Sequence, residues 1–246
     1  MRDAPATGSG GAGVLSVMSA IAVKVAFDRS IVSSFQAATG LHLDIVWQPT
    51  TVLMRQIRDG RRADVIVAID ESMDALEGEG IIDPHGRVDI ASAVLGVAVP
   101  SGAPHPDIST VASFRDALLK AEGVAFSTGG ASGIYFSALI SRLGIADRIT
   151  AVTIPAGFTA EKLVTGEAAL AVQQISELIS VPGVEVVGPF PDEVQSTTNF
   201  SAAMFTEAAD RAGASAFLDT LASKSAHAAY EAAGLVSRLA HVSTSR

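Results

Sequence analysis

Apolar residues occur along this chain in two arrangements, either in short continuous runs or at every third or fourth position. Continuous runs of this length are typical of buried strands, and the wider spacing is typical of helices that pack on a sheet. Between residues 14 and 79 a strand pattern and a helix pattern alternate three times. This alternation predicts a parallel sheet with helices on both faces. The predicted strands are 14–18, 41–47 and 63–68, and the predicted helices are 23–39, 51–58 and 72–79.

A second unit of the same kind begins after the apolar strand pattern at 93–99, which Pro100 ends. We therefore expect an α/β protein with two lobes, each a mostly parallel sheet flanked by helices, with the second lobe inserted in the first. The expected boundaries are a flexible segment at 1–13, lobe 1 at 14–95 and 196–240, and lobe 2 at 96–195. The remaining predicted strands are 123–127, 149–154, 168–173 and 184–187, and the remaining predicted helices are 111–120, one from Gly133, 159–165, 207–223 and 225–233.

The turn at 129–135, with the sequence Gly-Gly-Ala-Ser-Gly-Ile-Tyr, connects the predicted strand 123–127 to the helix that follows it. Small residues at a helix start leave backbone N–H groups accessible, and the helix dipole favours negative charge there. The turn therefore suits an anion-binding site. The same glycines also suit a plain tight turn between strand and helix, and spacing alone leaves both interpretations open.

Small or neutral polar residues follow most of the predicted strands. Ligands of open α/β sheets bind outside the carboxyl ends of the strands, so we expect these residues to line a cleft between the lobes that closes like a hinge. Hydroxyls, amides and backbone N–H groups can hold an anion without a charged side chain. The alternative role for each Ser or Thr at such a position is helix capping. The predicted ligand-binding residues are Ser19, Ala20, Thr50, Ser132, Gly133, Gly157 and Gln174.

The net charge of −9 makes nucleic acid and anionic membrane surfaces poor partners. The lack of cysteine excludes disulfides and thiolate chemistry. No apolar stretch reaches the roughly 18–20 residues that span a bilayer. Residues 1–11 contain no apolar core of a secretory signal, so we expect a periplasmic location if a signal has been removed and a cytoplasmic one otherwise.

Motifs of catalysis are missing from the sequence. It contains no Gly-x-Ser-x-Gly elbow around Ser132, no phosphate-binding Lys loop and no His-x-x-x-His pair. We therefore expect no catalytic residue, no metal site and no cofactor. Glu177 follows Gln174 closely, and two roles stay open for it: a general base beside the cleft, or a solvated position on a helix.

Several short segments follow one another in a recognisable order: 50–60, Ala63-Asp64-Val65, Ser132 to Tyr135, Gly166-Glu167-Ala168, Val187-Gly188-Pro189 and Ala233-Gly234. In this order they resemble the molybdate-type periplasmic solute-binding proteins of ABC transporters, over about residues 15–234. The resemblance implies a class II periplasmic-binding-protein fold that closes over a small oxyanion or carboxylate, an ABC transporter permease as partner, and a monomer. It places Thr50 at a ligand-binding Ser of the family, Ser132 at a backbone amide that faces the ion, and 156–158 near another such amide.

The chain departs from this family at two expected hydroxyls. The Ser of the first loop is replaced by Ala22, or is displaced to Ser19, and the ligand-binding Tyr is replaced by Gln174. An amide offers both a donor and an acceptor, which suits a carboxylate at least as well as a tetrahedral oxyanion. One branch of the same fold acts as aconitate isomerase, which moves a double bond by proton transfer, and this is the alternative function. A ligand-sensing domain of a transcription regulator is a third possibility, against which the lack of a basic helix-turn-helix segment counts.

Overall fold

A ten-stranded sheet runs through the whole molecule in the computed structural model, which describes residues 13–155 and 157–239. Its main path has the strand order β2-β1-β3-β9-β4-β7-β5-β6, and β8 and β10 each pair with β4 beside this path. The strands are β1 (Val14–Ala20), β2 (His42–Gln48), β3 (Val65–Ile69), β4 (Val88–Pro100), β5 (Val124–Ser127), β6 (Ala151–Ile154), β7 (Leu170–Gln174), β8 (Val184–Pro189), β9 (Thr197–Met204) and β10 (Val236–Ser237).

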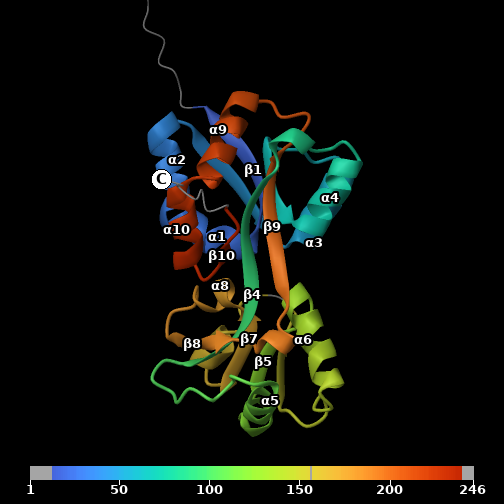
Figure 1. The fold of residues 1–246 in the computed structure, drawn as a ribbon, viewed down its shortest axis with the longest axis vertical. Coiled ribbons are helices and arrows are strands. Elements are labelled where there is room, and N and C mark those ends of the chain that lie inside the picture. The colour runs from blue at the N-terminus through green and yellow to red at the C-terminus, as the bar shows by residue number, and fades with distance from the viewer. Residues whose placement is uncertain (1–12, 156, 240–246) are drawn as a thin grey trace, which may run out of the picture.

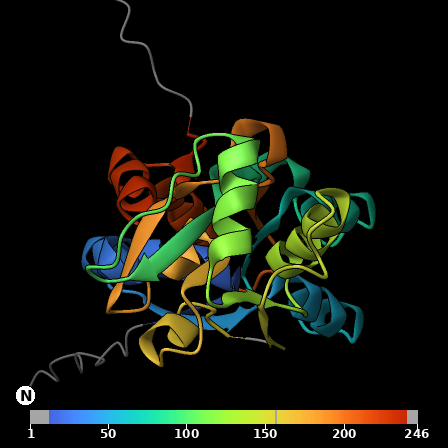
Figure 2. The same ribbon diagram turned by 90° about the horizontal axis from the view of Figure 1, so that it is seen from below.

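Helices cover this sheet in two groups, and the two lobes lie one above the other (Figure 1). Seen from below, α5 lies on the outside of lobe 2, nearest the viewer (Figure 2). The helical segments are η1 (Ile21–Val23), α1 (Lys24–Ala26), η2 (Phe27–Ile31), α2 (Val32–Thr39), α3 (Thr50–Arg58), α4 (Asp70–Gly78), η3 (Pro84–Gly86), α5 (Val111–Lys120), α6 (Ala131–Arg142), α7 (Glu161–Val164), α8 (Ile175–Leu178), η4 (Asp192–Val194), α9 (Arg211–Leu221) and α10 (Lys224–Ala232).

Parallel pairing occupies both flanks of the sheet and confirms the predicted α/β class. In lobe 1, β1 pairs in parallel with β2 and β3, and in lobe 2, β5 pairs in parallel with β6 and β7. The centre is antiparallel, because β9 pairs with β3 and with β4, and β4 pairs with β7 and β8. The strands that cross between the lobes therefore add antiparallel pairs that the alternating pattern does not predict.

Each lobe has its own hydrophobic core. The buried members of the lobe 1 clusters all lie before residue 94 or after residue 199, and those of the lobe 2 clusters all lie between residues 95 and 194. In lobe 1 the ring of Phe217 makes T-shaped contacts with the rings of Phe27 and Phe35, with centroids 5.9 and 5.0 Å apart. We propose the boundaries 14–95 with 196–240, and 96–195, which agree with this division except at Leu95, whose side chain packs in the lobe 2 core. Of the segment 1–13, which was expected to be flexible, residues 1–12 lie outside the described residues.

The strand β4 is longer than its sequence pattern predicts, since it begins at Val88 and not at residue 93. Its first half pairs with β9 and β10 in lobe 1, and its second half pairs with β7 and β8 in lobe 2. At the crossing the side chain of Gln195 pairs with the backbone of Leu95: its Oε1 accepts from the Leu95 N–H at 2.9 Å, and its Nε2 donates to the Leu95 carbonyl at 3.0 Å. Within the described ranges, no helix is long and apolar enough to cross a membrane.

Candidate functional site

A cavity of about 360 Å³ lies between the two lobes. The six strands that pair in parallel all end at it, because Ala20, Pro49, Ile69, Ser127, Pro155 and Gln174 stand at or directly after their carboxyl ends and line the cavity. This is where the sheet topology predicts a ligand. The other lining residues are Ile21, Ala22, Thr50, Thr51, Thr198 and Phe200 from lobe 1, and Gly129, Gly130, Ala131, Ser132, Ile134, Gly157, Phe158, Gln173 and Glu177 from lobe 2.

Five helical segments begin at the wall of this cavity without a side-chain cap. Their N-cap residues are Ala20, Pro49, Ile69, Gly130 and Gln174, and none of these side chains accepts a hydrogen bond from its helix. The first N–H groups of a helix have no partner inside it. Of the five segments, α3, α4 and α6 have at least nine residues, which is long enough for their dipoles to favour negative charge at these ends.

The other helices of at least nine residues in the described part of the protein have the opposite arrangement. Thr110 caps α5, Asp210 caps α9 and Ser223 caps α10, each through a hydrogen bond from a backbone N–H to its side chain. The capping role that the sequence left open for Ser and Thr is therefore wrong for Thr50 and Ser132, which occupy the first turns of α3 and α6. Among the helices of at least nine residues, those without a side-chain cap all begin at the cavity. Their first N–H groups are therefore available to an anion.

Two glycines of the turn 129–133 are required by close approach to neighbouring backbone. A Cβ on Gly129 would lie 2.6 Å from the carbonyl oxygen of Pro155, and one on Gly133 would overlap Ser127. Neither glycine has a positive φ. The tight turn that the glycines suited is therefore observed, and the turn is also a wall of the cavity; anion binding there stays a prediction.

Five of the seven predicted ligand-binding residues line the cavity: Ala20, Thr50, Ser132, Gly157 and Gln174. The other two do not. Ser19 is fully buried and its Oγ donates to the carbonyl of Ala20, and Gly133 packs against Ser127 behind the wall. Ala156 lies outside the described residues, whereas Gly157 and Phe158 line the cavity.

Glu177 is the one titratable side chain among the described residues that line the cavity. Burial raises the pKa of Glu177 to about 7, although hydrogen bonds from the Gln174 backbone and the Gln173 side chain partly oppose this rise. A carboxyl group with such a pKa can both accept and donate a proton near neutral pH. Of the two roles left open by the sequence, the position beside the cleft is therefore the one observed.

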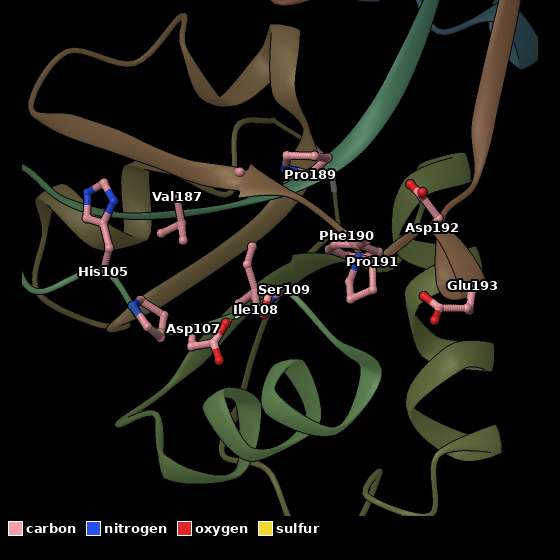
Figure 3. A pocket seen from close by; sticks show the side chains of 12 residues that line it. His105, Asp107, Ile108, Ser109, Val187, Pro189, Phe190, Pro191, Asp192 and Glu193 are labelled. Carbon is pink, nitrogen blue, oxygen red and sulfur yellow. Dashed lines mark hydrogen bonds between the residues drawn. The ribbon is translucent and has the colours of Figure 1, made fainter.

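A second, more open hollow of about 660 Å³ lies on the outer part of lobe 2, between residues 105–109 and 187–193 (Figure 3). Apolar side chains such as Ile108 and Phe190 lie between His105 at one end and Asp192 and Glu193 at the other (Figure 3). His105 faces Glu185 at 3.2 Å. None of the predicted ligand-binding residues lines this hollow, so the interlobe cavity is the candidate site.

Comparison with known proteins agrees with this architecture. Residues 15–236 match the family described as bacterial extracellular solute-binding protein. The chain belongs to this family. Among curated proteins, aconitate isomerase from Pseudomonas sp. is 35% identical over 215 residues, which cover 84% of this chain and 82% of that protein.

Solved structures of solute-binding proteins share the fold. The periplasmic molybdate-binding protein of Azotobacter vinelandii superimposes with a TM-score of 0.72 at 21% identity, covering 90% of this chain and 98% of the other. The tungstate-binding protein of Desulfovibrio alaskensis superimposes with a TM-score of 0.66 at 12% identity, covering 93% and 100%. These likenesses confirm the two-lobed periplasmic-binding-protein fold that the short segments indicated.

Some residues that line the cavity of this solute-binding protein do not follow a strand, so the search at strand ends could not identify them. Thr198 and Phe200 lie within β9 and not after it, and Ile134 lies one turn inside α6. Gln173 was expected only as the last residue of the strand 168–173, yet it is 4% exposed and hydrogen-bonds to residues on one side of the cavity. The sequence did contain an indication of this role, since a glutamine within an otherwise apolar buried strand must have hydrogen-bond partners.

Proposed function

We propose that this solute-binding protein captures a small anion, an oxyanion or a carboxylate, between its two lobes. The observation that carries the proposal is the convergence of uncapped helix starts on one cavity, with α3 and α4 from lobe 1 and α6 from lobe 2. Among the described residues that line the cavity there is no Lys, Arg or His. Backbone N–H groups and neutral side chains would therefore hold the anion.

Within that class the lining favours a carboxylate over a tetrahedral oxyanion. Ile21, Ile134, Phe158 and Phe200 give the cavity apolar surfaces that suit a carbon skeleton. Gln174 provides an amide donor and an acceptor at the end of β7. Thr50, with 9% of its surface exposed, is the most buried of the three lobe 1 threonines that line the cavity, and it lies at the start of α3.

A thermal-shift series with molybdate, tungstate, sulfate, citrate and the two aconitates tests this proposal. An anion at about 100 times its Kd stabilises the folded protein by roughly 2.7 kcal/mol. Thr50→Val and Gln174→Leu each remove one hydrogen bond to a charged ligand, and we expect each to weaken binding by about tenfold or more. Asp192→Asn, in the hollow of lobe 2, is the control and should bind like the parent protein. Lack of stabilisation by every anion would refute the proposal.

A second candidate function, isomerisation of aconitate, is favoured by Glu177 in the same cavity and by the 35% identical relative. Moving the double bond requires a base that removes a proton from the carbon beside a carboxylate. It also requires an acid that returns a proton to the far carbon of the former double bond, so the composition of the ligand does not change. Glu177 can serve in both roles because burial raises its pKa to about 7. An assay that follows the ultraviolet absorbance of cis- and trans-aconitate decides between binding alone and catalysis.

The location and the macromolecular partner follow from the family as proposals. We propose that the protein works outside the cytoplasm as a monomer, and that in the binding role it delivers its anion to an ABC transporter permease. Cell fractionation of the product of the complete gene tests the location. Co-purification with a permease encoded beside that gene tests the partner.

A further inference from the structure

One side of the cavity is organised by the side chain of Gln173, which is buried at the end of β7. Its Oε1 accepts from the backbone N–H of Thr159 at 2.9 Å and from the Thr159 Oγ1 at 3.0 Å. Because a backbone N–H can only donate, these contacts identify the amide oxygen and fix the direction of the amide. The Nε2 donates to the carbonyl of Gly157 at 3.1 Å, and the Gln173 side chain also hydrogen-bonds to the Glu177 carboxyl.

The Glu177 carboxyl is thereby held in place from two directions. The backbone N–H of Gln174 and the amide of Gln173 both donate to it. Glu177 is the third residue of α8, and it faces the same cavity as Gly157 and Gln174. Gln173 therefore connects the loop at 157–159 on one side of the cavity to the acidic group on the other.

No positive side chain compensates Glu177 in the described part of the protein. Neither β7 nor η1, both packed against α8, carries a titratable group, and β4 and β8 carry Asp89 and Glu185. Asp89 pairs with Arg238, and Glu185 accepts from the Gly102 N–H and pairs with His105. Near Gly234, whose Cβ position would meet Ile175 of α8, Glu231 pairs with His227.

An anion that enters the cavity therefore meets a single acidic group with no cation beside it. Two like charges in one cavity disfavour ionisation of the weaker acid. A carboxylic acid beside a carboxylate instead forms a short, charge-assisted O–H···O hydrogen bond. Desolvation of the half-buried Glu177 makes the protonated form accessible at neutral pH, because its pKa is already about 7 before any anion binds.

We infer that Glu177 and the bound anion share one proton, so that the cleft takes up a proton from solvent when it binds a fully ionised carboxylate, and that Gln173 positions the Glu177 carboxyl for this contact. The inference rests on the proposed binding of an anion in the cleft. It adds a requirement on the ligand, which must present an oxygen that can accept a hydrogen bond from a carboxylic acid. It holds for a binding protein and for an isomerase alike.

Titration calorimetry with trans-aconitate, repeated at pH 8 in buffers of different ionisation heat, counts the protons taken up. The parent protein should take up close to one proton per anion, and its affinity should fall by up to about tenfold per pH unit above pH 7. Glu177→Gln should bind without proton uptake and with an affinity that does not change over this range. Glu185→Gln, on β8 and outside the cavity, is the matched control and should behave like the parent protein.

The role of Gln173 has a separate readout. Gln173→Met removes the donor to the ionised Glu177, so the pH at which affinity begins to fall should move upward. Thr159→Val removes the hydroxyl bonds to Gln173 Oε1 and to the Val172 carbonyl but keeps the Gln173 donor to Glu177, so it should leave that pH unchanged. Glu177→Gln decides the main inference whatever the stability of the Gln173 variant.

The outcomes separate the two proposals. Equal proton uptake in the parent protein and in Glu177→Gln would overturn the shared proton and leave anion binding intact. Binding of none of the tested anions at any pH would overturn both. An unchanged pH profile in a folded Gln173→Met would overturn the positioning role alone.

Discussion

Gly133 at the start of α6 lies against the end of β5, so close that a Cβ at position 133 would overlap the carbonyl oxygen of Ser127. Gly133→Ala must therefore displace the N-terminus of α6 from the sheet. We expect it to lower the free energy of unfolding by about 3 kcal/mol and to abolish anion binding. Urea unfolding together with a thermal-shift series measures both effects.

The control for that variant is Gly78→Ala, at the end of α4. Its Cβ would meet nothing within 4 Å and its φ is not positive, so the substitution should stabilise the protein by about 0.4–1 kcal/mol. A Gly133→Ala variant as stable as the parent would show that the helix start can move, and would contradict the close packing.

Asp64 joins three segments of lobe 1 and should be needed for stability above pH 4. It is 4% exposed, and it accepts from the N–H and Oγ of Ser16 at 2.9 and 2.6 Å and from the N–H of Asp210 at 2.9 Å. Asp64→Asn replaces one acceptor oxygen by a donor, so at least one of these bonds is lost, at a cost of about 1–3 kcal/mol.

The pH dependence of this loss has a definite sign. Burial raises the pKa of Asp64, but hydrogen bonds from the Asp210 N–H and from Ser16 outweigh it, so the pKa lies below the ordinary 3.8. The stabilisation is therefore complete above pH 3.8 and disappears as the pH falls through the native pKa. Urea unfolding between pH 2 and pH 6 should show the parent and Asp64→Asn converging at acid pH. Asp44→Asn, exposed on β2, is the control and should differ little at any pH.

Glu177 should have the opposite effect on stability. Its pKa is about 7 in the folded protein against an ordinary 4.5, so the folded state favours the protonated acid. Any contribution to stability is complete below pH 4.5 and is lost as the pH rises through 7. Glu177→Gln should match the parent at pH 4.5 and exceed it by about 1–2 kcal/mol at pH 8.5, after allowance for screening by solvent.

Differential scanning calorimetry at these two pH values measures this crossover without any ligand. Glu71→Gln, an exposed residue of α4, serves as the control and should not show the gain at pH 8.5 that Glu177→Gln shows. A constant difference for Glu177→Gln would contradict the raised pKa.

Gln195 should contribute to the free energy of unfolding, because it lies where the chain crosses between the lobes. Its amide satisfies both the N–H and the carbonyl of Leu95. Gln195→Ala leaves the Leu95 N–H without this acceptor, whereas the Leu95 carbonyl keeps its hydrogen bond from the Phe190 N–H, and we expect a loss of about 1–3 kcal/mol. Gln56→Ala, on the surface of α3, should cost less than about 0.5 kcal/mol. Denaturant unfolding of the two variants checks the difference.

Much of the fold could be predicted from apolar spacing because each strand and helix of the two lobes buries one continuous face. The helix at 111–120 is observed with those bounds. The first half of β4 could not be found, because Asp89 and Ser92 interrupt the apolar run and their partners, Arg238 and Asn199, lie more than 100 residues away. The short helix α8 was also missed, since four residues are too few to show a period.

For the candidate site, the strand ends were predictable and the roles of the side chains were not. Thr50, Ser132 and Gln174 reach the cavity as expected because a parallel sheet brings its carboxyl ends together. Ser19 turned out to point away, since side chains on a strand alternate between faces and a shift of one residue reverses the direction. The role of Gln173 depends on Thr159 and Gly157, whose nearness no pattern in the sequence shows.

The strand β4 has a mechanical consequence for the whole molecule. It belongs to the cores of both lobes, since Ile90 and Ala93 pack in lobe 1 and Leu95 and Val97 pack in lobe 2. Ala93 and Leu95 lie in one continuous strand with no loop between them, so a rotation of one lobe relative to the other has to twist this hydrogen-bonded strand. A change in the angle between the lobes should therefore meet an elastic restoring force from β4. Unfolding of either lobe would also remove the strands that pair with β4 on that side. The two lobes should therefore unfold in a single cooperative transition.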